Sequence, residues 1–183
     1  MSKLETNTID TVSGTTNLVI GSTNTSTITM PNGKLTGQNC PAFEAYLSAD
    51  QSVSDATLTK GEFNTEVLDT DNFYDNTTNY RFTPNVAGKY FVTGHIQAAV
   101  GSDDLYDGIG RIYKNGSSYR ETRVNPQNGS PEREVTLHTT AIIDMNGTTD
   151  YVEYFGYIDV GGGSPQFSSD DKGSYFSAYR IGS

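Results

Sequence analysis

The feature that most constrains this sequence is the run over residues 74–97, which reads YDNTTNYRFTPNVAGKYFVTGHIQ. Pro84 has a fixed φ and no backbone N–H, so a strand that precedes it must stop there. Gly88 allows the chain to turn through a positive φ that larger residues resist. After Lys89, aromatic and β-branched residues alternate with a period of two. The run therefore predicts two strands joined by a rigid turn.

The remainder of the sequence repeats this character. Gly, Asn, Ser and Thr interrupt nearly every apolar run, and no segment of a dozen residues has helical periodicity, so we expect an all-β protein. Its 183 residues suffice for one ordinary domain plus an appendage. The single cysteine, Cys40, excludes a disulfide framework within the chain. Stability must then come from packing or from oligomerisation.

Charge locates a boundary near residue 40. Residues 1–40 hold two basic and two acidic groups, which leaves ten basic and twenty acidic groups for residues 41–183. The first segment is also poor in aromatic residues. We therefore expect an N-terminal stalk or attachment region over 1–40 and a globular head over 41–183. The net charge of −10 disfavours nucleic acid and anionic membrane surfaces as partners.

The first 40 residues contain a weak repeat. Leu18 and Ile20 form an apolar pair two residues apart, and Ile28 and Met30 repeat it ten residues later, between turn-prone segments. One interpretation is a flexible polar linker. A linker does not need paired apolar residues, so we favour short strands that complete a core shared between identical chains.

The run over 74–97 resembles the central signature of C1q-like globular heads, which belong to the tumour necrosis factor jelly-roll superfamily. The shared elements are Tyr-Asp, six residues, then FTPNVAGKYF. Four further segments resemble the family in the same order: PAFEAYLSADQ (41–51), FNTEVLDT (63–70), IYKNG (112–116) and SYFSAYRIG (174–182). In the last, Ala178 and Tyr179 stand where the family often has Gly and Phe. The resemblance implies a jelly-roll β-sandwich and a homotrimer packed through its inner sheet.

The N-terminal pattern TIDTVSGTTNLVIGSTN resembles the stalks of tailed-bacteriophage fibres. Such proteins often place a Thr- and Gly-rich strand region before a globular tip. The opening MSKLETNT has no apolar core of the kind a signal peptide needs. No run is long enough to span a membrane, so we expect no membrane insertion. The expected location is the virion surface, after synthesis in the host cytoplasm.

Several predicted strands are apolar or aromatic on both faces. Tyr151, Phe155 and Tyr157 alternate with Val152, Tyr154 and Ile158, and Phe176 and Ala178 alternate with Tyr175 and Tyr179. The outer face of a lone sandwich should be polar, so the second face is expected to meet another subunit. The residues assigned to the trimer interface are Tyr175, Tyr179, Phe43 and Ala45.

The sequence offers little for catalysis. His95 and His138 have no acidic or cysteine partner at a triad or metal-ligand spacing, and structural roles are favoured for both. Asp103, Asp104 and Asp107 are a candidate calcium site, although their loop fits no defined calcium motif and solvated surface acids are the preferred interpretation. No other cofactor is expected. A glycan-depolymerising tailspike would need two acids in a defined cleft, and no cleft element is recognisable.

Loops on rigid β scaffolds commonly carry recognition, and four polar loops are predicted here. They span 69–79, 101–108, 125–131 and 161–173 and suit carbohydrate or polar protein surfaces. The candidate receptor contacts are Asn72, Tyr74, Asp104, Tyr106, Asn128 and Gln166. The predicted function is the homotrimeric short fibre or tip of a tailed bacteriophage, without enzymatic activity, anchored to other virion proteins through residues 1–40. The alternative is a capsid decoration or head fibre.

Overall fold

Strands are the main regular structure in the described part of the chain. The computed structural model describes residues 40–101, 104–126 and 132–182. The elements are β1 (Ala42–Tyr46), β2 (Gln51–Ser52), β3 (Thr59–Lys60), β4 (Thr65–Asp69), β5 (Tyr74–Asp75), β6 (Arg81–Phe82), β7 (Gly88–Ala99), β8 (Leu105–Lys114), β9 (Ser117–Val124), β10 (Glu134–Met145), β11 (Val152–Val160), β12 (Gln166–Phe167), the short 3₁₀ helix η1 (Asp170–Lys172) and β13 (Tyr175–Gly182). The predicted strands of residues 1–40 lie outside the described residues.

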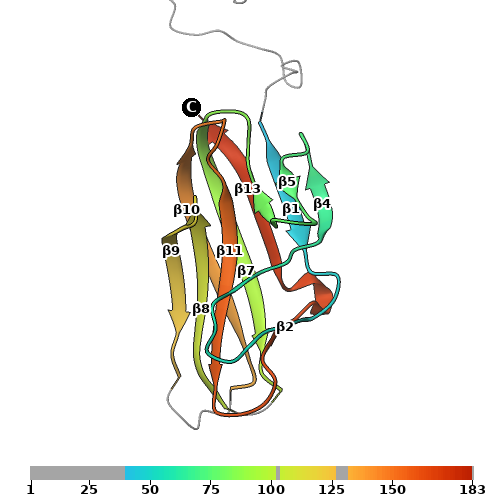
Figure 1. The fold of residues 1–183 in the computed structure, drawn as a ribbon, viewed down its shortest axis with the longest axis vertical. Helices are drawn as coiled ribbons and strands as arrows, with labels where there is room; N and C mark the ends of the chain where they lie inside the picture. Colours follow the sequence, from blue (N-terminus) through green and yellow to red (C-terminus); the bar gives the residue numbers. More distant parts are fainter. Residues whose placement is uncertain (1–39, 102–103, 127–131, 183) are drawn as a thin grey trace, which may run out of the picture. The chain divides into compact units, whose positions relative to one another are not determined.

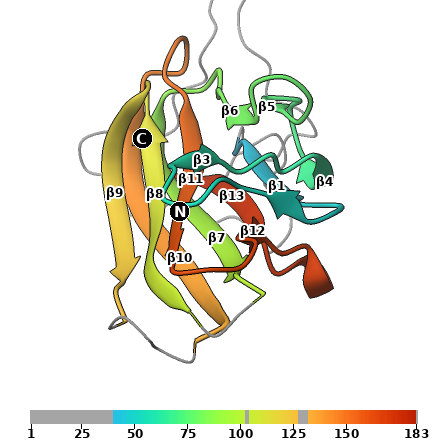
Figure 2. The same ribbon diagram turned by 60° about the horizontal axis from the view of Figure 1, so that its bottom comes forward.

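These strands form two antiparallel sheets that pack face to face (Figures 1 and 2). Sheet A has the order β2-β12-β7-β13-β1-β4, and β10 pairs with β7 along its whole length. Sheet B has the order β5-β6-β11-β8-β9, with β3 beside β11. The expected all-β sandwich is confirmed.

The run over 74–97 occupies the position that its sequence predicts. β6 ends at Phe82, two residues before Pro84, and β7 begins at Gly88 with a φ of 146°. A Cβ on Gly88 would lie 2.3 Å from the carbonyl oxygen of Gly182, so this position also requires glycine for a close approach. β7 pairs with β10, β12 and β13, which makes it the central strand of sheet A.

The core lies between the sheets and is rich in aromatic rings. Phe43 stacks on Tyr74 with ring centroids 4.4 Å apart and on Phe82 at 4.6 Å, and Phe176 meets it edge-on at 5.1 Å. The predicted separation of the β11 side chains into two faces is confirmed, because Val152, Tyr154 and Ile158 on one face are fully buried. Close packing of this kind is sensitive to the loss or gain of a single methylene group.

Three predicted loops contain more regular structure than expected. The prediction of a loop over 101–108 is wrong from Leu105 onward, because β8 begins there and pairs with β11. The 69–79 loop contains β5, and the 161–173 loop contains β12 and η1. Asp and Gly residues suggested a loop over 101–108, but antiparallel pairing can accommodate them once the polar side chains find partners.

The long strands run between two opposite ends of the sandwich (Figure 1). At one end, here called the base, β1 begins and β13 finishes, and the N–H of Arg180 donates to the carbonyl oxygen of Pro41 at 3.0 Å. At the other end, here called the tip, the connections that follow β7, β9 and β11 meet. Backbone hydrogen bonds join them there: Val100 to Arg133 at 2.9 Å, Gly161 to Asp104 at 3.0 Å and Ser164 to Val100 at 3.2 Å.

Candidate functional site

The outward face of sheet A is aromatic. Residues opposite one another in a register share a face, and two rows with aromatic side chains lie on either side of a polar row of Thr140, Thr93, Ser177 and Glu44. One row is His138, His95, Tyr175 and Tyr46, and the other is Ile142, Phe91, Tyr179 and Ala42. Within these rows His95 stacks on Tyr175 at 5.0 Å, and Phe91 contacts Tyr179 at 5.5 Å. We call this surface the outer face of sheet A.

Two of the four residues predicted for the trimer interface lie on this face and two do not. Tyr175 is half-buried and Tyr179 is 50% exposed. Phe43 and Ala45 are core residues of the single chain, with exposures of 2% and 0%, and their assignment to a trimer face is wrong. The reason lies in the register: Phe43 and Ala45 pair with Ala178 and Phe176, which point inward.

Among the described residues, large apolar side chains that are exposed concentrate on strands of sheet A and on β9. They are Val67 (52%), Leu68 (43%), Tyr119 (45%), Ile142 (57%), Tyr179 (50%) and Ile181 (47%). Val67 and Leu68 belong to β4 at one edge of sheet A, whereas Ile142 belongs to β10 at the opposite edge. A depression of about 290 Å³ lies beside Val67, lined also by Glu44, Tyr46, Lys172 and Tyr175. Exposed apolar side chains at both edges of a sheet are candidates for contact with a partner.

A second candidate surface is the tip. A depression of about 330 Å³ lies where its connections meet, lined by Ala99, Gly101, Arg133, Glu134, Ser164 and Gln166. Three of the predicted receptor contacts belong to this end of the molecule, namely Asp104, Tyr106 and Gln166. Gln166 is partly committed, because its side-chain amide donates to Asp50 at 2.7 Å. The negative charge of Asp104 raises the pKa of the Tyr106 hydroxyl. Asn128 lies outside the described residues.

The candidate calcium ligands are not all available as ligands. Asp107 is 6% exposed, and Arg123 donates to it from Nε at 2.9 Å and from Nη2 at 2.6 Å. A paired carboxylate of this kind is already satisfied by its guanidinium. Asp103 lies outside the described residues, and no group of three or more His, Cys, Asp or Glu among the described residues is arranged to hold a metal ion.

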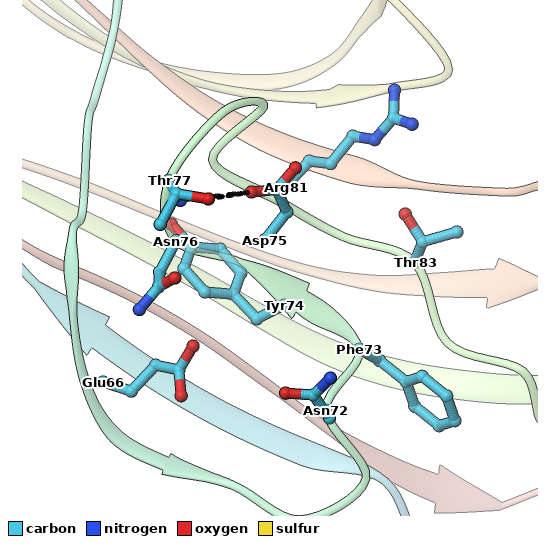
Figure 3. A pocket seen from close by; sticks show the side chains of 9 residues that line it. All are labelled: Glu66, Asn72, Phe73, Tyr74, Asp75, Asn76, Thr77, Arg81 and Thr83. Atoms are coloured by element: carbon cyan, nitrogen blue, oxygen red, sulfur yellow. Dashed lines mark hydrogen bonds between the residues drawn. The ribbon is translucent and has the colours of Figure 1, made fainter.

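A third depression lies between β4, β5 and β6, near the base (Figure 3). Its volume is about 510 Å³, and its lining includes Glu66, Asn72, Asn76 and Arg81 around the ring of Tyr74. The predicted contact Asn72 lies on this surface and is exposed, with a φ of 59°. The predicted contact Tyr74 is a core residue, 4% exposed, whose hydroxyl donates to the carbonyl of Phe63 at 3.0 Å. Burial raises its pKa.

The loop beside this depression is held by one carboxylate. Asp75 accepts hydrogen bonds from the backbone N–H of Thr77, Thr78 and Asn79 at 3.1, 2.9 and 3.1 Å. These bonds, that of Thr78 first, hold the pKa of Asp75 well below its usual range. Desolvation raises the pKa of Glu66, and Asp69 adds to this. The surface can therefore offer both donors and acceptors to a polar ligand.

Comparisons with known proteins support the fold alone. A comparison with protein-family models and one with curated proteins find no match. Solved structures of murine APRIL resemble this chain, at pH 5.0 with a TM-score of 0.56 and 7% identity and at pH 8.5 with a TM-score of 0.53 and 9% identity. Each covers 78% of this chain and 99% of its own. Eiger TNF from S. frugiperda matches with a TM-score of 0.51 and 10% identity, over 78% of this chain and 91% of that one.

These likenesses agree with the predicted fold, which is a tumour necrosis factor/C1q-like jelly-roll β-sandwich. At such low identity they carry no information about ligands or partners, since one fold hosts many functions. Among the described residues, no helix is long and apolar enough to cross a membrane.

Proposed function

We propose that this chain is a non-enzymatic structural and binding protein that acts as a homotrimer, the short fibre or tip of a tailed bacteriophage. Residues 1–40 attach it to other virion proteins, and the head contacts the host surface. The observation that carries the proposal is the outer face of sheet A, with aromatic side chains in two of its rows and with Ile142 and Tyr179 at least half exposed. Water alone is a poor partner for such a face.

The distribution of apolar residues favours a ring of copies over a symmetric dimer. Exposed apolar side chains occur at both edges of sheet A, on β4 and on β10, and these edges are different surfaces. A head-to-tail contact brings one edge of each copy against the other edge of the next, and such contacts close into a ring when the rotation allows. The C1q-like resemblance of the sequence implies a ring of three.

The tip is the surface that we assign to host contact. It lies opposite the base, where β1 begins. Its polar lining, with Arg133, Glu134 and Ser164, suits hydrogen bonding to carbohydrate or to a polar protein surface. Three copies present each contact three times, so weak individual contacts can add through avidity.

Two measurements test this proposal. Sedimentation of the purified full chain is expected to give three times the chain mass of 19.9 kDa, and a stable monomer would contradict it. Labelling of purified particles with an antibody to the head is expected to mark the tail. Label on the capsid would instead assign the protein to capsid decoration.

Host contact is tested separately with the purified head. Replacement of Tyr106 and Ser164 by Ala at the tip is expected to reduce binding to susceptible cells, whereas Thr77→Ala near the base leaves binding unchanged. If the unaltered protein binds neither cells nor their surface polymers, the receptor function fails.

A further inference from the structure

The two histidines of the chain are neighbours on the outer face of sheet A. His95 on β7 lies directly opposite His138 on β10 in the antiparallel register. Their ring centroids are 5.6 Å apart, with the planes inclined at 49°. They are the only histidines in the sequence, which places both imidazoles of the chain within reach of one small ligand.

The hydrogen bond of His95 fixes its tautomer. Its Nδ1 contacts the carbonyl oxygen of Gly173, which can only accept, so Nδ1 carries the proton and Nε2 keeps a free lone pair. An imidazole that donates one ring N–H to a backbone carbonyl has the arrangement found in metal-binding histidines.

His138 can adopt the complementary state. Its Nε2 lies 2.9 Å from the hydroxyl oxygen of Thr93, and a hydroxyl can either donate or accept. When Nε2–H donates to Thr93, Nδ1 keeps its lone pair. His138 is exposed on the single chain, so a small cation can reach it from solvent.

The separation of the rings fits a shared ion. A zinc ion about 2.1 Å from an imidazole nitrogen lies about 3.2 Å from the ring centroid, so rings whose centroids are 5.6 Å apart are close enough to share one ion. We propose that His95 and His138 together bind one transition-metal ion, of the class of Zn²⁺, Ni²⁺ or Cu²⁺, on the outer face of sheet A.

The side chains near the two histidines already have other partners. Tyr175 stacks on His95, and the Glu134 carboxylate accepts a hydrogen bond from the Gln97 side chain at 3.1 Å. No third His, Cys or carboxylate of the described residues completes the site. The remaining positions go to water or to a ligand from a second copy of the chain. Both ligands belong to one chain, on the face that the proposed function assigns to the contact between copies.

Calorimetric titration of the untagged full chain with ZnCl₂, NiCl₂ or CuCl₂ tests the proposal. The chain carries Cys40→Ser, because Cys40 is an exposed free thiol that also binds soft metals. All three ions are expected to bind, Cu²⁺ most tightly, whereas Mg²⁺, which prefers oxygen ligands, does not. Cu²⁺ bound at the site is expected to show nitrogen coupling in its electron paramagnetic resonance spectrum.

Variants separate this site from diffuse binding by surface acids. His95→Gln, which keeps a donor for the Gly173 carbonyl, and His138→Gln are each expected to weaken Ni²⁺ affinity by more than about tenfold. Glu134→Gln, on the same strand as His138, is the matched control and leaves the affinity unchanged. Circular dichroism and the thermal midpoint without metal verify that each variant is folded.

Three results would overturn the proposal. They are the absence of binding at millimolar metal, unchanged binding in the double His95→Gln, His138→Gln variant, and an equal loss in Glu134→Gln. A rise in thermal midpoint with NiCl₂ that is present in the parent chain and lost in both histidine variants would support it, because a ligand that binds the native state stabilises it.

Discussion

Single residues in the core are under tight steric control, and Gly94 is the sharpest example. Gly94 on β7 and Gly110 on β8 face the ring of Tyr154, whose hydroxyl donates to the carbonyl of Leu137 at 2.6 Å. A Cβ on Gly94 would lie 2.2 Å from the Tyr154 ring. The two glycines therefore create the space that this tyrosine occupies.

We predict that Gly94→Ala lowers the free energy of unfolding by about 1–3 kcal/mol, because a buried ring has to move. Gly182→Ala is the matched control, since a Cβ there meets no atom within 4 Å, and it is expected to be close to neutral. Denaturant unfolding measures both. Equal stability of the two variants would show that the core accommodates the added methyl group.

The low pKa of Asp75 gives a second prediction at this scale. Its folded pKa lies below the unfolded value, so the unfolded chain binds the proton first and stability falls as the pH drops below about 4. Asp75→Asn removes this titration and is expected to flatten the loss of stability between pH 5 and pH 3. An unchanged slope in unfolding experiments would refute the role of these hydrogen bonds.

Individual residues were the least predictable part of this protein from sequence. Tyr74 was expected in a receptor loop but is buried against Phe43, because a tyrosine in a polar loop can still turn its ring inward. The salt bridge of Asp107 with Arg123 joins neighbouring strands, and no local spacing in the sequence predicts it. The pairing of His95 with His138 also depends on register, which the alternation of single strands does not supply.

Whole strands were predicted more reliably than single residues. Alternation divides each strand into two faces, and the division of β11 and of β13 is confirmed. It does not say which face points inward, and for β1 the choice was wrong. Pairing with β13 decides it, because Phe43 opposite Ala178 must share the inward face of that neighbour. In β13 itself, Phe176 and Ala178 are buried and Tyr179 is exposed.

At the scale of elements, we predict that β13 supplies part of the contact between copies. Tyr179→Glu places a carboxylate within the apolar row that includes Phe91 and Ile142, and Tyr175→Glu places one beside the ring of His95. A buried unpaired charge is costly, so each variant is expected to dissociate the trimer. Analytical ultracentrifugation checks this. Tyr106→Glu, on β8, is the control and is expected to remain trimeric.

At the scale of the molecule, the head should fold without the N-terminal region. Residues 40–182 belong to one compact unit with its own core. We predict that a chain lacking residues 1–40 remains folded and trimeric but no longer incorporates into particles, because the proposed function assigns attachment to this neutral N-terminal region. Circular dichroism, sedimentation and incorporation assays test these three statements in turn. Incorporation at the full-length level would contradict the attachment role.

The all-β class followed from turn signals and alternation, which extend over most of the head, and the two-sheet sandwich followed from the resemblance to C1q-like heads. The arrangement of loops did not. Connections from three distant parts of the chain meet at the tip through backbone hydrogen bonds among Val100, Arg133, Ser164, Asp104 and Gly161. The predicted 69–79 loop instead lies near the base, around β5 (Figure 1).

The location of the strand ends has an evolutionary consequence. Because β1 begins and β13 ends at the base, the described connections at the tip join strands within the head. Insertions and sequence drift are best tolerated in such exposed connections. Changes there leave the register of β7 with β10 and of β8 with β11 intact. The head is thus suited to acquire new binding specificities by loop replacement, and foreign peptides grafted into the connection after β11 should be displayed without loss of assembly.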